Sequence, residues 1–416
     1  MFRSGRRKDG HSEAGISLKK ELRDTLGVDN TTSDSSSKSG TLKKVCRKIA
    51  AIAMAATVIV STIPSPAALD FGLASEVAVH KYSVRMDSPF TRSDQAMIAL
   101  QRMYDPLTGS WNGWWNTANA LLTVIDNASQ THNYQFVWDI KNTFVQNDVN
   151  NFINSYGDDS GWWAITWIRA YDLTKNKEYL TTAEAIFKHL ANTWNSTCGG
   201  GIPWNTGQFS GTPKGALTNE IFLIVSSMLY ERTSNTKYLD WARKEYLWFT
   251  NSGLIGKSDL VYNSLNSSCK VKKRSPWTYI QGEAIGAFVE FSKATGDKKP
   301  IYQAELIANA NDSYNVDENG ILLEKTCCYG GSLIFKGMYI ENLYILYQAD
   351  HKKEYKNFII KNANALWSND RNGNYAIGVN WAGPFTGANQ STQSAGIDVL
   401  DEAEVLSQTS ASGHHR

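Results

Sequence analysis

The sequence lacks a large excess of charge, has few cysteines, and shows little β-type alternation of polar and apolar residues after Asp87. Its 416 residues carry 42 Lys and Arg against 40 Asp and Glu, a net charge of +2. This balance excludes the basic footprint of a nucleic-acid-binding protein. The sequence contains no CxxC motif and no Cys/His spacing of the kind that is typical of zinc sites. We therefore expect neither a metal nor another cofactor. The scarce alternation argues against a sheet-based fold.

A run of about 20 apolar residues, the length that crosses a bilayer, is also missing. The apolar run at 49–63 has 15 residues, follows four basic residues and ends before Pro64. We therefore predict a signal peptide or an uncleaved signal anchor over 42–70, preceded by a disordered extension over 1–41. No apolar tail ends the chain, so we expect a disordered tail over 407–416 and no GPI anchor. The body is predicted to be secreted, or held at the cell surface or wall, and to meet a membrane only through this segment.

Export agrees with the cysteines of the body, which are even in number. Cys46 lies in the targeting segment, whereas Cys198, Cys269, Cys327 and Cys328 can form two disulfides in three connectivities. The vicinal Cys327–Cys328 bridge is the strained and least favoured choice. Sequons for N-glycosylation in the body occur at Asn127, Asn195, Asn266, Asn311 and Asn389.

Helical periodicity dominates the body and predicts twelve helices. Their expected ranges are 92–104, 113–127, 135–152, 160–173, 177–195, 215–233, 237–251, 277–295, 299–315, 331–348, 353–369 and 393–406. Short turns such as TKNKEY alternate with long Gly-rich loops, which predicts six helical hairpins closing into a double ring. The even-numbered helices are richer in Gly, Ala and aromatics and are expected to be inner. The long loops would then gather on one face, where a site is expected.

The segment 157–174, GDDSGWWAITWIRAYDLT, holds the strongest chemical signal. Asp158 and Asp159 follow a glycine, and Trp162, Trp163 and Trp167 come directly after them. Asp and Ser favour helix starts, so we expect a helix to begin between Asp159 and Gly161. Paired carboxylates beside indole faces suit sugar chemistry. An isolated Asp pair more often only caps a helix, but three neighbouring tryptophans favour a site.

Other candidates lie at the starts of the predicted inner helices or in the long loops. Trp204 and Asn205 belong to GGGIPWN, Asn219 to TNE, Tyr279 and Gln281 to TYIQGE, Lys336 to FKGMY, and Trp381 to GVNWAGP. Each of them alone also fits packing within the core. Their shared position predicts that the aromatics line a cleft around the Asp pair and that the polar residues contact its ligand.

These motifs resemble glycoside hydrolase family 76, the α-1,6-mannanases and their fungal cell-wall relatives. The resemblance rests on YGDDSGWWAITWIRAYDLT, GGGIPWN with TNEIFL, TYIQGEAIGAFVEF, FKG and GVNWAGP…SAGIDVL, and covers about 90–406. It implies an all-α, (α/α)6 barrel as a catalytic domain over 85–406, acting as a retaining endo-hydrolase of α-1,6-mannan. It further implies that Asp158 is the nucleophile and Asp159 the acid/base. Many fungal relatives carry a GPI signal and are thought to be transglycosidases.

Geometry agrees with a retaining enzyme, because adjacent side chains can reach the separation of about 5–5.5 Å that such carboxylates need. Repulsion between them should raise one pKa, as a general acid requires. Two other classes remain open: a non-catalytic mannan-binding protein, and another (α/α)6 enzyme such as an unsaturated-uronide hydrolase or a lyase. The latter would favour basic residues near the site, whereas His132, His189 and His351 are predicted to lie away from it. We expect a monomer.

Overall fold

The computed structural model describes residues 90–207, 213–271, 276–325 and 333–412. The predicted disordered extension and targeting segment lie outside these residues, as do Cys46, Cys327 and Cys328. Within the described ranges, no helix is long and apolar enough to cross a membrane.

The described chain contains twelve α-helices, and each corresponds to one of the predicted ranges. They are α4 (Arg92–Gln101), α5 (Trp114–Thr131), α6 (Trp138–Asn147), α7 (Gly157–Thr174), α8 (Lys177–Thr193), α9 (Ala216–Thr233), α10 (Thr236–Asn251), α11 (Thr278–Thr295), α12 (Lys299–Tyr314), α13 (Phe335–Asp350), α14 (Lys353–Asn369) and α15 (Gln390–Ser412). Two 3-10 helices, η1 (Asn150–Phe152) and η2 (Thr197–Gly199), and two antiparallel strands, β1 (Lys214–Gly215) and β2 (Ser264–Leu265), lie in the loops. Helix α15 runs to Ser412, six residues beyond the end of the predicted helix at 406.

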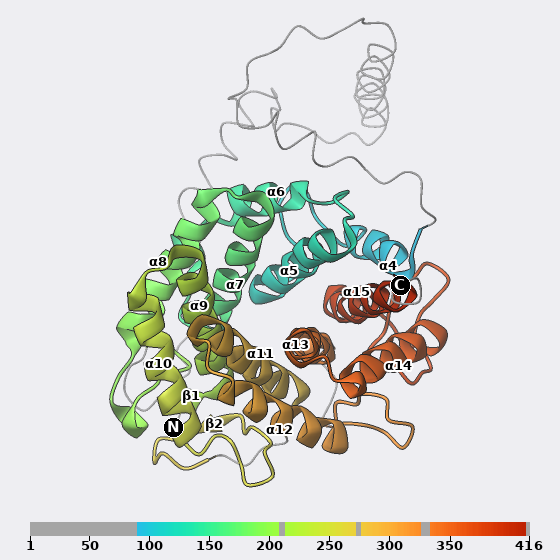
Figure 1. The fold of residues 1–416 in the computed structure, drawn as a ribbon. Helices are drawn as coiled ribbons and strands as arrows, with labels where there is room; N and C mark the ends of the chain where they lie inside the picture. The colour runs from blue at the N-terminus through green and yellow to red at the C-terminus, as the bar shows by residue number, and fades with distance from the viewer. Residues whose placement is uncertain (1–89, 208–212, 272–275, 326–332, 413–416) are drawn as a thin grey trace, which may run out of the picture. The chain divides into compact units, whose positions relative to one another are not determined.

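The helices form two concentric rings (Figure 1). Helices α5, α7, α9, α11, α13 and α15 each contact the next, and α15 contacts α5 to close the inner ring. Helices α4, α6, α8, α10, α12 and α14 lie outside it. Five hairpins are made by consecutive helices. The sixth pair consists of α15, the last helix of the chain, and α4, the first helix that the structure describes. The predicted (α/α)6 barrel is therefore confirmed. The inner helices are the second, fourth, sixth, eighth, tenth and twelfth of the predicted ranges, as expected.

Four turns from an inner to an outer helix repeat the motif Thr-X-Asn or Thr-X-Asp. The central residues, His132, Lys175, Ser234 and Gly296, have φ of 62°, 61°, 56° and 74°. In each turn the Thr hydroxyl accepts a hydrogen bond from the third residue's N–H. The side-chain oxygen of that third residue accepts one from the N–H two residues further on. The motif ends the inner helix in all four turns, and in two of them its third residue, Asn176 or Asn235, is also the N-cap of the outer helix that follows, α8 or α10.

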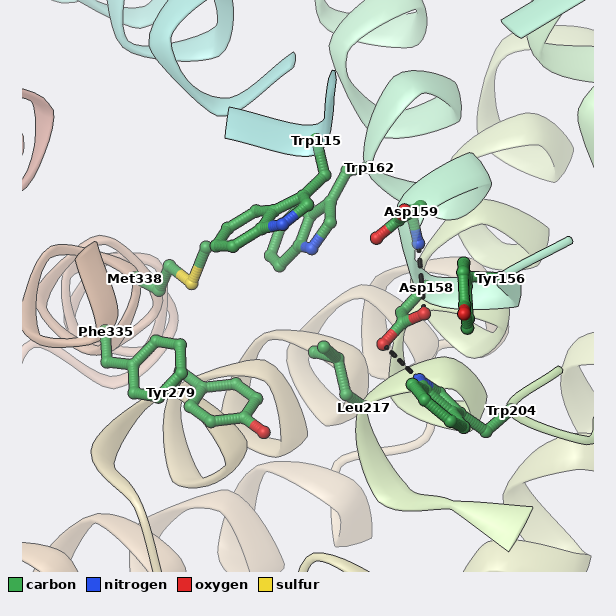
Figure 2. A pocket seen from close by; sticks show the side chains of 10 residues that line it. All are labelled: Trp115, Tyr156, Asp158, Asp159, Trp162, Trp204, Leu217, Tyr279, Phe335 and Met338. Atoms are coloured by element: carbon green, nitrogen blue, oxygen red, sulfur yellow. Dashed lines mark hydrogen bonds between the residues drawn. The ribbon is translucent and has the colours of Figure 1, made fainter. Parts of the chain in front are cut away.

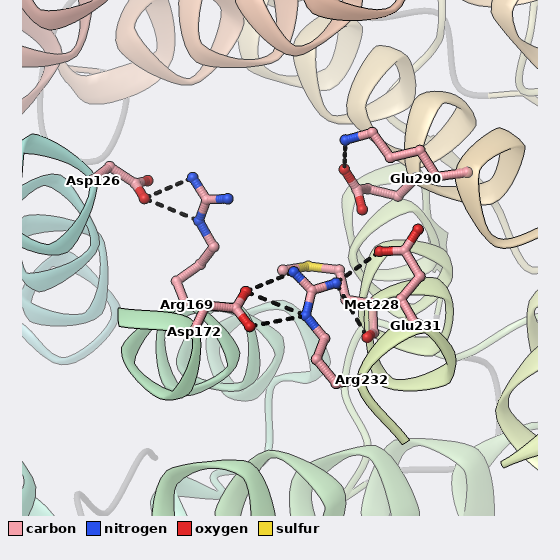
Figure 3. A network of polar contacts seen from close by, with 8 residues as sticks. Asp126, Arg169, Asp172, Met228, Glu231, Arg232 and Glu290 are labelled. Atoms are coloured by element: carbon pink, nitrogen blue, oxygen red, sulfur yellow. Dashed lines mark hydrogen bonds and ion pairs between the residues drawn. The ribbon is translucent and has the colours of Figure 1, made fainter. Parts of the chain in front are cut away.

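At this end of the barrel, ion pairs join neighbouring inner helices (Figure 3). Arg169 of α7 contacts Asp126 of α5 at 2.7 Å, and Arg232 of α9 contacts Asp172 of α7 at 2.6 Å. Burial raises the pKa of Asp126, and the Arg169 guanidinium opposes that rise. The pairs therefore hold together the end of the barrel at which the inner helices finish.

The sequons and cysteines of the body occupy different environments. Asn127 and Asn311 are buried in the core at 1% and 0% exposure, whereas Asn266 is exposed. Cys198 and Cys269 form a disulfide, one of the pairings that the sequence left open. It links the loop before α9 to the loop before α11.

Candidate active site

Helix α7 begins earlier than predicted, at Gly157, with Tyr156 as its N-cap residue. The cap has no side-chain hydrogen bond, but the Gly157 N–H donates to the carbonyl oxygen of Trp204 at 2.9 Å. Asp158 and Asp159 therefore lie inside the first turn, where the helix dipole favours negative charge. A Cβ atom at Gly157 would lie 2.7 Å from the Thr218 methyl group, so glycine allows α7 to approach α9 closely here.

The two aspartates face a cleft of about 320 Å³ at the N-terminal ends of the inner helices. It is lined by Trp115, Tyr156, Asp158, Asp159, Trp162, Trp204, Leu217, Tyr279, Phe335 and Met338. Figure 2 shows the carboxylates on one wall, Tyr279, Phe335 and Met338 on the opposite wall, and Trp115 and Trp162 between them.

A second cavity of about 400 Å³ shares Asp158, Trp204, Leu217 and Tyr279 with the cleft. Its other lining residues are Pro213, Gly215, Thr218, Asn263 and Ser264, so it is the more polar of the two. Because both cavities reach Asp158, they adjoin at this carboxylate, and together they form the groove in which the carboxylate pair lies.

One rule of the barrel explains how the cleft is built. The second residue of each of four inner helices lines it: Trp115 in α5, Asp158 in α7, Leu217 in α9 and Tyr279 in α11. Helix α13 adds Phe335 from its first turn. The cleft is therefore the place where the N-termini of the inner helices converge.

The carboxylates differ in their hydrogen-bond donors. Asp158 accepts from the Trp204 indole Nε1 and from the Asp159 backbone N, both at 3.1 Å. Asp159 accepts from Asn154 Nδ2 at 2.8 Å. Burial, followed by the charge of Asp159, raises the pKa of Asp158 to about 7, and burial also raises the pKa of Asp159. Near neutral pH the cleft therefore disfavours ionisation of both groups at once.

Several predicted site residues meet around this pair. Trp162, Trp204 and Tyr279 line the cleft as expected, and the Tyr279 hydroxyl donates to Asn263 Oδ1 at 3.3 Å. Asn205, beside Trp204, does not line the cleft. Its Oδ1 accepts from the Gly207 N–H at 2.9 Å, so its side chain shapes the loop.

Five other predicted residues, Trp163, Asn219, Gln281, Lys336 and Trp381, are buried away from both cavities. Trp163 follows Trp162 by one residue, which turns it about 100° around the helix. It therefore packs against Phe152 and stacks on Trp167, with ring centroids 4.7 Å and 5.6 Å away.

Asn219 and Gln281 share a structural role. Each is the fourth residue of its inner helix, and its side-chain amide bonds both the N–H and the carbonyl of one loop residue, Ile202 or Val261. Gln393 of α15 holds the α14–α15 loop in the same way, through the Ile377 N–H and the Tyr375 carbonyl. Asn219 and Gln281, predicted as ligand contacts, thus anchor loops that border the cleft.

Sequence reasoning missed Trp115, Tyr156, Leu217, Phe335 and Met338. The sequence contained a usable signal for Trp115 and Leu217. Each lies two residues after the start of a predicted inner helix, the same position that Tyr279 has in its own helix. In FKGMY the sequence pattern predicts the polar Lys336, whereas its apolar neighbours Phe335 and Met338 reach the cleft. His132, His189 and His351 do not line it. In the described part of the chain, no group of three or more His, Cys, Asp or Glu side chains is arranged to hold a metal ion.

Comparison with known proteins gives one family. The model of glycosyl hydrolase family 76 matches residues 91–412. A putative mannan endo-1,6-alpha-mannosidase of Schizosaccharomyces pombe is 25% identical over 252 residues, which are 54% of this chain and 57% of that protein. The mannan endo-1,6-alpha-mannosidase DCW1 of Candida glabrata is 24% identical over 291 residues, 62% of this chain and 64% of that protein. The chain thus spans less than two thirds of the length of these two relatives.

Solved structures share the fold. An inactive variant of the alpha-1,6-mannanase of Salegentibacter sp. HEL1_6, with two adjacent aspartates replaced by alanine and alpha-1,6-mannotetrose bound, has a TM-score of 0.70 at 24% identity. The match covers 76% of this chain and 98% of that one. Dfg5 of Chaetomium thermophilum, in complex with glucosamine, has a TM-score of 0.68 at 17% identity, covering 76% and 90%. At these identities the likeness supports the (α/α)6 fold.

Proposed function

The chain belongs to glycosyl hydrolase family 76, and from this premise we propose that it is an endo-acting, retaining glycosidase that cleaves or transfers α-1,6-linked mannan. The observation that carries the proposal is the pair Asp158–Asp159 lying along a groove bordered by aromatic side chains. The pair is the only Asp-Asp dipeptide in the sequence. The names of the curated relatives support mannan as the substrate, as does the mannotetrose bound by the Salegentibacter protein.

In the proposed reaction, Asp158 and Asp159 act in two steps. An ionised Asp158 oxygen attacks the anomeric carbon while the glycosidic C–O bond breaks, and Asp159 gives its proton to the leaving oxygen. A covalent mannosyl ester on Asp158 results. Asp159 then takes a proton from water or from an acceptor hydroxyl, whose oxygen attacks the same carbon and releases Asp158. Two displacements leave the anomeric configuration unchanged.

The hydrogen bonds around the pair support this division of roles. Asp158 has two N–H donors, which stabilise a carboxylate, whereas Asp159 has one. When Asp159 carries the shared proton, the repulsion that opposes ionisation of Asp158 disappears. The pair is then in the state that the first step needs.

The walls of the groove supply binding surface. Trp115, Trp162, Trp204 and Tyr279 offer flat apolar faces for the C–H side of a pyranose. Asn263 and Ser264 line the second cavity, where their polar side chains can bond sugar hydroxyls. The continuation of the groove from the cleft into the second cavity, with Asp158 lining both, suits a substrate cleaved within its chain.

An extracellular place of action, at the cell wall or surface, completes the proposal. The Cys198–Cys269 disulfide supports it, since such bridges persist in oxidising compartments. The predicted targeting segment over 42–70 agrees with it. We expect the enzyme to act there as a monomer.

Product analysis on linear α-1,6-mannan tests the function. Internal cleavage should release oligosaccharides of several lengths from the start, with retained configuration by NMR. Adding a short α-1,6-mannooligosaccharide as acceptor separates transfer from hydrolysis, because transfer lengthens the acceptor and hydrolysis does not. Absence of both products, from a protein whose circular dichroism shows it folded, would refute the proposal.

A further inference from the structure

Trp204 is bonded to the start of α7 through both its main chain and its side chain. Its carbonyl oxygen accepts from the Gly157 N–H at 2.9 Å, and its indole Nε1 donates to Asp158 Oδ2 at 3.1 Å. Figure 2 shows this second bond on the side of Asp158 that faces away from Trp162. One residue of a distant loop thus contacts the first two residues of the helix that carries the carboxylate pair.

We propose that Trp204 is a positioning residue for Asp158, whose indole N–H orients the carboxylate toward the reacting carbon and stabilises its ionised form. The inference rests on the proposed function and refines it. It separates Trp204 from the other aromatic residues that line the cleft, none of which has a side-chain hydrogen bond to Asp158 or Asp159 in the described part of the chain. A hydrogen bond from a fixed donor matters most in a cleft that disfavours charge.

The loop that carries Trp204 is held by several contacts. The Trp204 N–H donates to the Pro213 carbonyl at 3.0 Å, and its ring lies against Tyr156 with centroids 4.9 Å apart. Lys214 is buried and bonds the Gly201 carbonyl at 2.5 Å and Asn195 Oδ1 at 2.9 Å. The Cys198–Cys269 disulfide ties the loop to its neighbour. The donor is therefore fixed before any ligand binds.

Packing alone does not account for an indole at this position. Trp204 is 42% exposed, so its ring gains less from burial than a core tryptophan does. A phenyl ring would keep a face for Tyr156 and for a sugar. That ring face would be smaller than the indole face, and the N–H donor to Asp158 would be lost altogether. A change that follows the N–H rather than the ring area distinguishes positioning from stacking.

Trp204→Phe tests the proposal, with Trp138→Phe as the matched control. Trp138 is also exposed, at 51%, and packs edge-on against Tyr104 outside the cleft. We expect Trp204→Phe to move the acidic limb of the kcat/KM profile upward by about one pH unit, the scale of a hydrogen bond to a charged group. At pH values below the wild-type acidic limb, kcat of Trp204→Phe should be about tenfold lower than that of the wild type, while KM stays within about twofold. Trp138→Phe should leave the whole pH profile unchanged.

A second measurement needs no activity. In protein labelled with ¹⁵N-tryptophan, the Trp204 indole signal, assigned by its loss in Trp204→Phe, should shift with pH as Asp158 ionises. In Asp158→Asn this shift should vanish. An indole signal that does not follow Asp158, or a Trp204→Phe loss confined to KM with an unmoved acidic limb, would overturn the proposal. If wild-type protein fails to cleave mannan, the proposed function is wrong, while the indole titration still decides the role of Trp204.

Discussion

The ammonium group of Lys336 lies 4.2 Å from the centroid of the Trp381 ring. Its Nζ also donates to the Val379 carbonyl at 2.6 Å, in the same α14–α15 loop. Burial lowers the pKa of Lys336 to about 7, against the opposing charges of Asp370 and Glu324. This pair fixes the loop on α13, away from the cleft that the neighbouring Phe335 lines.

Replacing Lys336 separates loop anchorage from ligand contact. We expect Lys336→Met to lower the free energy of unfolding by about 1–3 kcal/mol, because the Val379 carbonyl loses its buried partner. KM for mannan should stay near the wild-type value. Chemical denaturation and initial rates measure both, with the exposed Lys353→Met as control. A large rise in KM without loss of stability would instead assign Lys336 to the ligand.

The two aspartates should differ in rescue behaviour. Asp158→Ala should lose activity even on aryl mannosides with good leaving groups, because no covalent intermediate can form. Asp159→Ala should keep the first step on such substrates, and azide should then give a mannosyl azide of retained configuration. On mannan each variant should lose at least about 10²-fold, the scale of acid/base catalysis. Retained azide product from Asp158→Ala would exchange the roles, and near-normal rates in both would reduce the pair to a helix cap.

The raised pKa of Asp158 predicts a pH-dependent stability. Its folded pKa of about 7 exceeds the unfolded value near 3.9, so the folded state binds more protons between these values. Stability should therefore fall as pH rises through this window. Asp158→Asn removes that cost and should raise the stability at pH 7.5 by roughly 1–3 kcal/mol.

At pH 4 the same substitution should change the stability little. Thermal unfolding at both pH values measures the difference, with the exposed Asp240→Asn on α10 as control. Equal effects of Asp158→Asn at the two pH values would show that Asp158 titrates normally in the folded protein.

The far end of the barrel should depend on its arginines. Arg169→Met leaves the Asp126 carboxylate buried without its cation, so we expect a loss of about 2–4 kcal/mol in unfolding free energy. The double variant Asp126→Asn/Arg169→Met should recover part of it, because no unpaired charge remains. The exposed Arg243→Met serves as control in denaturant titrations. A single variant as stable as wild type would show that the pair contributes nothing.

Local sequence was sufficient wherever one helix or one turn carries the information. The 3.6-residue periodicity and the short turns between hairpin helices predicted all twelve helices, since the hydrogen bonds of helices and turns join residues close in sequence. The start of α7, at Gly157 rather than between Asp159 and Gly161, depends instead on a contact between residues far apart in the sequence. Its first N–H bonds to Trp204, a partner on another loop that no local capping rule reveals.

The sequence by itself determined the double ring of helices, the loop face and the Asp158–Asp159 pair, because periodicity and turn chemistry are local properties of the chain. Tertiary structure alone decided which side chains reach that pair. Trp162 lines the cleft while Trp163 does not, and Phe335 lines it while Lys336 holds a loop. The physical reason is the rotation of each inner helix about its own axis, which is set by contacts with its neighbours and decides which side chains face the cleft. Loop packing adds to this, because it brings Trp204 within hydrogen-bonding distance of Asp158, a residue far away in the sequence.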